Sequence, residues 1–149
     1  MALRNIVTIP NNLLREKSRE VTEFNESLGQ LIDDMIDTMF RADGVGLAAP
    51  QVGILRRICV VCVDGKTVYE LVNPVIVKQS GEQVGPEGCL SVPGRHGIVC
   101  RPRKIVVEAQ DRTGKKHTYK LEGFIAVAFC HEIDHLDGTL YIDKVIEEA

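Results

Sequence analysis

Hydrophobic residues recur at every third or fourth position between residues 25 and 43, the pattern of an amphipathic helix. The residues that form this apolar stripe are Leu28, Leu31, Ile32, Met35, Ile36, Met39 and Phe40. Asn25 can cap the start of the helix, and Gly44 is placed to end it. The pattern therefore predicts an N-terminal amphipathic helix.

Runs of β-branched and apolar residues predict several extended segments after this helix. They cover residues 57–63, 67–72, 75–78, 98–100, 104–110 and 115–121. Asp64-Gly65 and the DRTG sequence at 111–114 are typical hairpin turns, so a mostly antiparallel sheet is expected. Two stretches rich in glycine and proline, GVGLAAPQVG (44–53) and GPEGCLSVPG (85–94), predict irregular loops.

A second helix is predicted from about residue 123 to 136, with Gly138 placed to terminate it. Its apolar face carries Phe124, Val127, Ala128, His131 and His135. The two histidines should therefore lie on the buried side of the helix. The expected fold is α+β, with mostly antiparallel sheet packed around this C-terminal helix.

Length and composition fit one globular domain spanning residues 1–149, since 44% of the 149 residues are hydrophobic. The 18 Lys and Arg are dispersed among 21 Asp and Glu, so no direct nucleic-acid patch is expected. The longest apolar run is far shorter than the ~20 residues that span a bilayer, and no secretory signal is recognisable. We therefore expect a cytoplasmic protein that does not bind membranes, in which the five cysteines are reduced or bind metal.

The segment FCHEIDHLDG (129–138) contains two histidines four positions apart, which a helix places on one face so that both can bind one ion. Glu132, next to the first histidine, is placed to act as a general base. The alternative is that both histidines are hydrogen-bonded core residues. A catalytic site of this kind needs a third protein ligand and an open position.

The residues alone do not identify that third ligand. In metalloproteases with a longer motif it would be a histidine three residues after Gly138, but Tyr141 stands there. Cys59 and Cys62 are three apart in a predicted strand and should face opposite sides of it, so they are poor partners for one ion. The remaining candidates are Cys89, favoured by its glycine- and proline-rich surroundings, His117, His96 or a carboxylate.

Three separated segments, GVGLAAPQ (44–51), EGCLS (87–91) and HEIDH (131–135), resemble in order and separation the three signature motifs of the peptide deformylases. The resemblance covers nearly the whole chain. It implies a hydrolase that removes the formyl group from the N-terminal formylmethionine of newly synthesised proteins, by attack of a metal-bound water with a glutamate as base and then acid. N-formylmethionyl nascent peptides, and with them the ribosome, are the implied partners of a monomeric enzyme.

The resemblance also implies roles at matching positions: metal binding by Cys89, His131 and His135, acid–base catalysis by Glu132, and binding of the substrate carbonyl oxygen by Gln51 and the backbone N–H of Leu90. Gly46 would let the substrate backbone approach the loop, and Arg101 would lie behind the ligands around the cysteine. The implied cofactor is Fe²⁺, with Zn²⁺ or Ni²⁺ as substitutes. One departure is Cys130, where many family members carry glutamine.

A pocket for the methionine side chain is expected beside the metal. Phe124, Val127 and Ala128 lie one and two turns before His131 on the same helix face, and Val45 could close the pocket from the first motif. The alternative is that these are core residues under the sheet. Two other functions are compatible with the H-E-x-x-H pattern: a zinc endopeptidase, and a zinc-stabilised binding domain with a fourth protein ligand.

Overall fold

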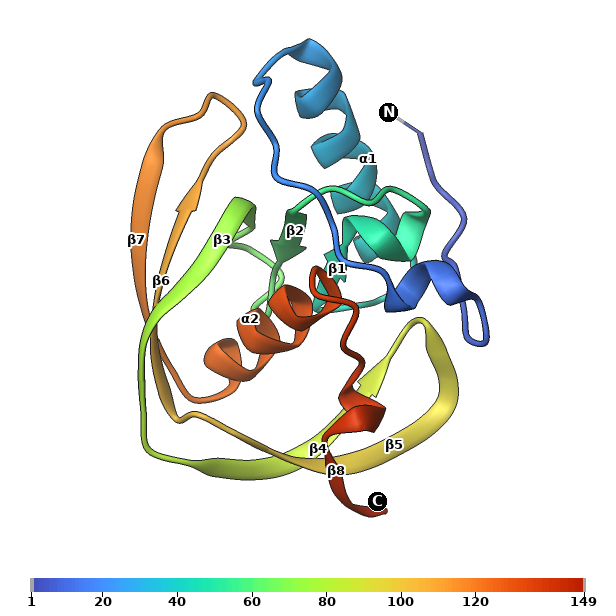
Figure 1. The fold of residues 1–149 in the computed structure, drawn as a ribbon, viewed down its shortest axis with the longest axis vertical. Helices are drawn as coiled ribbons and strands as arrows, with labels where there is room; N and C mark the ends of the chain where they lie inside the picture. The colour runs from blue at the N-terminus through green and yellow to red at the C-terminus, as the bar shows by residue number, and fades with distance from the viewer. Residues whose placement is uncertain (1, 149) are drawn as a thin grey trace.

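Two antiparallel sheets and two α-helices form the fold, and α2 lies in the middle of the molecule (Figure 1). A computed structural model describes residues 2–148. The first sheet has the strand order β1-β2-β3-β6-β7, with bounds Gly46–Ala48, Ile58–Val61, Tyr69–Ser80, Lys104–Gln110 and Lys116–Glu122. The second has the order β4-β5-β8, with bounds Gln83–Cys89, Val92–Arg101 and Val145–Glu148. The α+β prediction with mostly antiparallel sheet is confirmed.

The first helix, α1, spans Glu26–Arg41 and begins as the sequence predicts. The Asn25 side chain accepts a hydrogen bond from the Leu28 N–H at 3.0 Å, which satisfies one of the free donors of the first turn. The helix ends earlier than Gly44, because the chain already turns at Asp43, whose φ is 58°. Most of the predicted apolar stripe is buried against β1 and β2, whereas Phe40 is 46% exposed.

The central helix, α2, spans Phe124–His135, within the predicted range. It packs against β1, β2 and β7, and its buried residues belong to the main core cluster together with residues of the large sheet. Gly138 follows the helix with a φ of 75°. A Cβ at this position would collide with the Arg15 carbonyl oxygen, so glycine is needed there to let the two chain segments meet.

The two predicted loops are more regular than expected. Residues 46–52 form β1 and the 3₁₀ helix η2 (Ala49–Val52), and residues 83–101 form the β4–β5 hairpin, with Leu90-Ser91 at its turn. Pro86 is tolerated because β4 is an edge strand, where a missing N–H need not break a ladder. Pro93 lies outside the part of β5 that pairs with β8. Glycine and proline therefore misled the prediction at both places.

Other boundaries also differ from the sequence pattern. The predicted segments 67–72 and 75–78 join into the single strand β3, which is irregular near Asn73, where φ is 52°. The strand β8 and the 3₁₀ helices η1 (Asn12–Arg15) and η3 (Tyr141–Asp143) were not predicted. Cys59 and Cys62 are buried in different core clusters, as expected for residues on opposite faces of the sheet.

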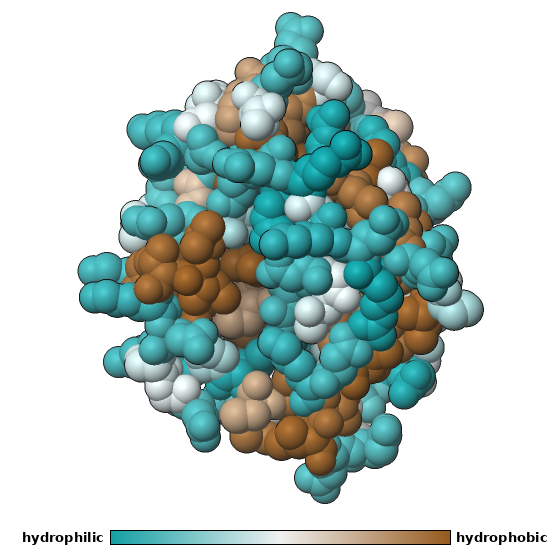
Figure 2. Space-filling view, viewed as in Figure 1, coloured by the Kyte–Doolittle hydropathy of each residue, from teal (hydrophilic) through white to brown (hydrophobic). Residues whose placement is uncertain are grey.

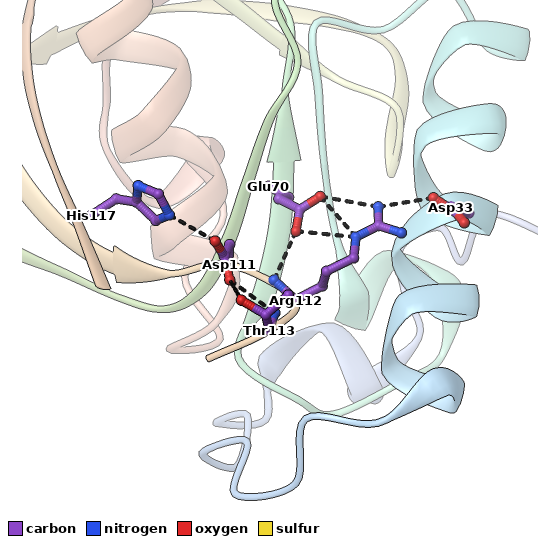
Figure 3. Close-up of polar contacts among 6 residues, drawn as sticks. All are labelled: Asp33, Glu70, Asp111, Arg112, Thr113 and His117. Atoms are coloured by element: carbon purple, nitrogen blue, oxygen red, sulfur yellow. Dashed lines mark hydrogen bonds and ion pairs between the residues drawn. The ribbon is translucent and has the colours of Figure 1, made fainter. Parts of the chain in front are cut away.

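An ion-pair cluster connects α1 with the large sheet (Figure 3). Arg112, in the β6–β7 turn, binds Asp33 of α1 at 2.9 Å and Glu70 of β3 at 3.0 Å. In the same turn, Asp111 accepts hydrogen bonds from the Thr113 backbone N–H and binds the His117 ring at 2.8 Å. His117 is thus engaged in this turn, which removes it as a candidate for the third ligand.

Hydrophilic side chains cover most of the face shown in Figure 2, and hydrophobic ones gather in separate patches. Exposed apolar residues occur on β3 and β4, at the start of α2 and on β8: Val75, Val77, Val84, Phe124 and Ile146. Within residues 2–148, no helix is long and apolar enough to span a membrane.

Candidate metal centre and active site

The β4–β5 hairpin and α2 bring one cysteine and two histidines together. The ligand atoms of Cys89, His131 and His135 all lie within 4.8 Å of one another, and Cys89 Sγ is 3.4 Å from His135 Nε2. Ligands bound at about 2.0–2.3 Å in a tetrahedron are ~3.5 Å apart, so this spacing fits a single ion. In the part of the chain that the structure describes, this is the only cluster of three such side chains.

A hydrogen bond to a buried carboxylate fixes the orientation of the His131 ring. Its Nδ1 lies 2.9 Å from Glu87 Oε1, so a proton on Nδ1 is donated to the carboxylate and Nε2 keeps its lone pair for an ion. The Tyr141 ring stacks on the imidazole, with centroids 6.0 Å apart. The Tyr141 hydroxyl donates to the Arg95 carbonyl oxygen, so it is turned to the backbone and this residue contacts His131 through its ring.

Arg101 organises the carboxylates behind the histidine. Its Nε and Nη2 donate to Glu87 at 2.9 and 2.8 Å, and its Nη1 donates to Asp134 at 2.6 Å. Although burial alone would raise the pKa of Glu87, hydrogen bonds from Arg101 and His131 lower it to about 2. The guanidinium therefore keeps the partner of His131 ionised. Arg101 thus lies behind His131, through the Glu87 carboxylate. The sequence analysis had expected it near Cys89.

The two histidines have different electrostatic surroundings. Burial opposes the charged form of His131, but the neighbouring Cys89 and Glu87 side chains raise its pKa to about 10. Burial and the adjacent His131 hold the pKa of His135 well below its usual value. The buried Nδ1 of His135 has no hydrogen-bond partner among the described residues. The lowered pKa keeps His135 neutral, which is the form of histidine that binds a metal ion.

Glu132 is buried beside this cluster with one free oxygen. Among the described residues, its Oε1 has no hydrogen-bond partner, and burial raises the pKa of the carboxyl to about 7. The side chain lies directly over Gly46: a Cβ at that position would be 2.5 Å from Glu132 Oε2. The close approach at Gly46 is thus made by the glutamate of the third motif.

Gln51 is held with its amide nitrogen toward the cluster. Its Oε1 accepts from the Ala48 backbone N–H at 2.9 Å, and its Nε2 donates to Ser91 Oγ at 3.1 Å and approaches Cys89 Sγ at 3.5 Å. These partners fix which end of the amide faces the cluster. Leu90 lies between Cys89 and Ser91, the two residues that Gln51 Nε2 approaches, so its backbone is adjacent to the same place in the hairpin turn.

A cleft of about 460 Å³ opens over these residues. Its walls include the residues predicted for a methionine pocket: Val45, Phe124, Val127 and Ala128. Phe124 is 57% exposed and Val45 41% exposed, so these two are not core residues, whereas Ala128 belongs to the core as well. A cavity of similar size, about 470 Å³, lies far from the cluster at the end of β3, β6 and β7 and contains none of the site residues.

The sequence analysis missed Glu87, Asp134 and the stacking role of Tyr141. Glu87 could have been found, because it is the carboxylate of the EGCLS motif, two residues before Cys89. His96 lines the cleft without joining the ligand cluster. Cys130, the departure from the family motif, is buried in the core, where burial raises the pKa of its thiol to about 11.

An α+β fold with an H-E-x-x-H helix, a nearby thiol and a buried glutamate beside a cleft defines a metal-dependent hydrolase. The family model described as "Polypeptide deformylase" matches residues 3–149. Peptide deformylases from Caldicellulosiruptor bescii and Lachnoclostridium phytofermentans are similar, at 55% identity over 98% of this chain and 87% of the relative, and at 51% over 100% and 93%. The chain belongs to the peptide deformylase family of enzymes.

Solved structures support the same assignment. The peptide deformylase from Thermotoga maritima superposes with a TM-score of 0.95 at 40% identity, covering 97% of this chain and 99% of that one. The peptide deformylase from Legionella pneumophila superposes with a TM-score of 0.94 at 46% identity, covering 97% and 86%. The family is metal-dependent, in agreement with the cluster of one cysteine and two histidines.

Proposed function

We propose that this chain hydrolyses the formyl amide at the N-terminal formylmethionine of newly made proteins and releases formate, as a single catalytic domain. The observation that carries the proposal is the convergence of Cys89, His131 and His135 beside a buried glutamate with a free oxygen. Three protein ligands in a cleft leave room for water and substrate at a fourth position.

The donor set fits a borderline or soft divalent ion. One thiolate and two imidazoles favour iron, zinc or nickel over magnesium or calcium, and we propose Fe²⁺ as the resident ion, with Zn²⁺ or Ni²⁺ as substitutes. When bound, such an ion would polarise the formyl carbonyl and bring the pKa of a water molecule near ~7.

Glu132 would move the protons. Its free Oε1 can take a proton from the attacking water, and the same carboxyl can then return that proton to the departing amine. The carboxyl is 5% exposed, so bulk solvent does not compete for it. The Gly46 backbone limits how far the carboxylate can move away from the cleft.

The oxyanion would be held by groups that are already in place. Gln51 Nε2 and the backbone N–H of Leu90, the residue after Cys89, would be the two donors, and the Gln51 amide is held by Ala48 and Ser91 before substrate arrives. Loss of one such donor typically lowers the rate by about 10²–10³-fold. Rigid donors of this kind stabilise the developing charge without first reorganising.

The apolar wall of the cleft would select methionine. Val45, Phe124, Val127 and Ala128 surround the space next to the metal ligands and offer an unbranched thioether a surface without charged groups. The partners are then N-formylmethionyl nascent chains, met at the ribosome in the cytoplasm, and the enzyme acts as a monomer.

The test is formate release. Protein purified without air and loaded with Fe²⁺ should release formate from a formyl-Met dipeptide, measured with a coupled formate dehydrogenase assay. His117→Ala, which changes a histidine paired with Asp111 outside the site, should remain active. Absence of formate with one iron bound per chain would reject the proposal.

Two further measurements separate the alternatives. Cleavage of an unformylated, N-blocked peptide would indicate an endopeptidase. A small hydroxamate should bind the loaded enzyme, since it needs an open coordination position; failure to bind would indicate a closed structural site.

A further inference from the structure

The N-terminal segment makes contacts with the site that its sequence does not suggest. In Figure 1, the dark blue chain runs from beside α1 past η2 to the turn between β4 and β5. The Val7 backbone N–H donates to the Gln51 carbonyl oxygen at 2.6 Å, and the Ile9 N–H donates to the Ser91 carbonyl oxygen at 2.9 Å. One short segment thus bonds to two motifs that are 40 positions apart in the sequence.

The spacing of the two donors explains how one segment reaches both motifs. Val7 and Ile9 are only two residues apart and donate to different motifs, so their two bonds tie the backbones of Gln51 and Ser91 to one short segment. Both side chains also pack against the same core cluster as Cys89 does, made of Leu14, Val92, Val99, Leu140 and Tyr141.

The other end of the segment is anchored on α1. The Ala2 backbone N–H donates to Asp34 at 2.9 Å, and Arg4 Nη2 pairs with the same carboxylate at 3.0 Å. The Arg4 backbone N–H donates to the Thr38 hydroxyl at 3.0 Å. Asp34 is only 3% exposed, so the anchor is a buried, multiply bonded acid. We call residues 2–9 the N-terminal strap.

We propose that Val7 and Ile9 are positioning residues, whose backbone N–H groups hold Gln51 and the Leu90-Ser91 turn at the separation that lets both oxyanion donors reach one oxygen. The role of these donors rests on the proposed function. The side-chain bond from Gln51 Nε2 to Ser91 Oγ spans the same gap, so the strap and this bond together form a closed frame around the donors. A loosened strap would let the Gln51 amide drift from its place.

The main variant is Val7→Pro, which removes the N–H that binds Gln51, and its matched control is Val7→Ala, which keeps the N–H and loses only packing. We expect kcat for formate release to fall between about 10- and 100-fold in Val7→Pro, with KM and metal content unchanged. Val7→Ala should stay within about 3-fold of the wild type, because the backbone bond survives. Equal losses in the two variants would overturn the proposal.

A double-mutant cycle tests whether the strap acts through Gln51. In the Gln51→Ala background, Val7→Pro should cost less than it does in the wild type, since the donor it positions is already absent. The same fold-loss in both backgrounds would show a general structural effect and would overturn the proposal.

A readout independent of activity separates this inference from the proposed function. The Ala48 backbone N–H donates to Gln51 Oε1, so its hydrogen exchange, followed by NMR, reports the position of the Gln51 side chain. Exchange should be faster in Val7→Pro than in Val7→Ala, with or without metal; unchanged exchange would overturn the role of the strap even if the enzyme deformylates. If Val7→Pro does not melt cooperatively, Arg4→Ala is the second variant, because it loosens the end of the strap that is anchored on α1. Hydrogen exchange of the Ala48 N–H should be faster in Arg4→Ala than in the wild type. An unchanged exchange rate in Arg4→Ala would also overturn the role of the strap.

Discussion

Replacing Gly46 by alanine would place a methyl group in space that Glu132 occupies. The Cβ would lie 2.5 Å from Glu132 Oε2 and 2.8 Å from both Cδ and Cγ, whereas atoms in ordinary contact are about 3.5 Å apart. Gly46 is paired with Val61 in β1, and Glu132 is 5% exposed, so neither can retreat into solvent. The carboxylate must therefore move by about 1 Å.

The size of the effect follows from this displacement. A shift of about 1 Å at a catalytic group costs on the order of 10²-fold in rate, so kcat for formate release should fall about 100-fold. Overpacking should also lower the free energy of unfolding by about 1–3 kcal/mol. Metal content should stay normal, because the three atoms nearest to the new methyl group all belong to Glu132 and none to Cys89, His131 or His135. Formate assays, metal analysis and thermal melting measure these three quantities.

Two controls test the reasoning. Gly29→Ala places a Cβ 3.6 Å from the nearest Arg112 atom, an ordinary contact, and should leave kcat unchanged. In a Glu132→Ala background, the stability cost of Gly46→Ala should largely disappear, because the clashing side chain is gone. Wild-type kcat in Gly46→Ala, or an equal stability cost in both backgrounds, would refute the steric explanation.

Four further outcomes are expected. Glu132→Gln should keep its metal but lose at least about 10²-fold in kcat, and a fully active variant would remove this residue from the proton transfers. Cys89→Ala should purify with a changed or reduced metal content, so normal content would contradict its role as a ligand. Glu87→Gln should weaken metal affinity about 10- to 100-fold, measured by competition with a chelator, because His131 loses its ionised partner; equal affinity would argue against that support. In metal-free protein, the Glu132 pKa is raised from 4.5 to about 7, so the protonated form favours folding below pH 4.5 and this contribution, ~3 kcal/mol, is lost as the pH rises through 7. The difference in Tm between the wild type and Glu132→Gln should therefore change across this window, and a constant difference would contradict the buried, raised pKa.

The parts of the fold that the sequence predicted well depend on local periodicity. The stripe of α1, the spacing of His131 and His135 on α2, and the alternation in β6 and β7 all follow from how a helix or a strand directs its side chains. Asn25 and Gly138 mark helix ends by chemistry that acts within a few residues. Such features need no knowledge of what the element packs against.

The family motifs identified a candidate third ligand, which periodicity could not do. Composition alone left Cys89, His117 and His96 as competing ligands, and the resemblance to the deformylases selected Cys89. The structure brings Cys89 to both histidines, leaves His117 on β7 paired with Asp111, and places His96 on the wall of the cleft. The choice depended on a long-range contact between the β4–β5 hairpin and α2.

Only the tertiary structure decided how the site is supported. Glu87 on one strand binds both Arg101 from the next strand and His131 from a helix. Gly46 is small because a side chain 86 positions later lies over it. The N-terminal strap reaches Gln51 and Ser91 only because two distant motifs fold onto it. Spacing along the chain specifies which residues share a face of one helix or strand. Contacts between elements depend on how their surfaces pack, and a local sequence pattern does not specify that packing.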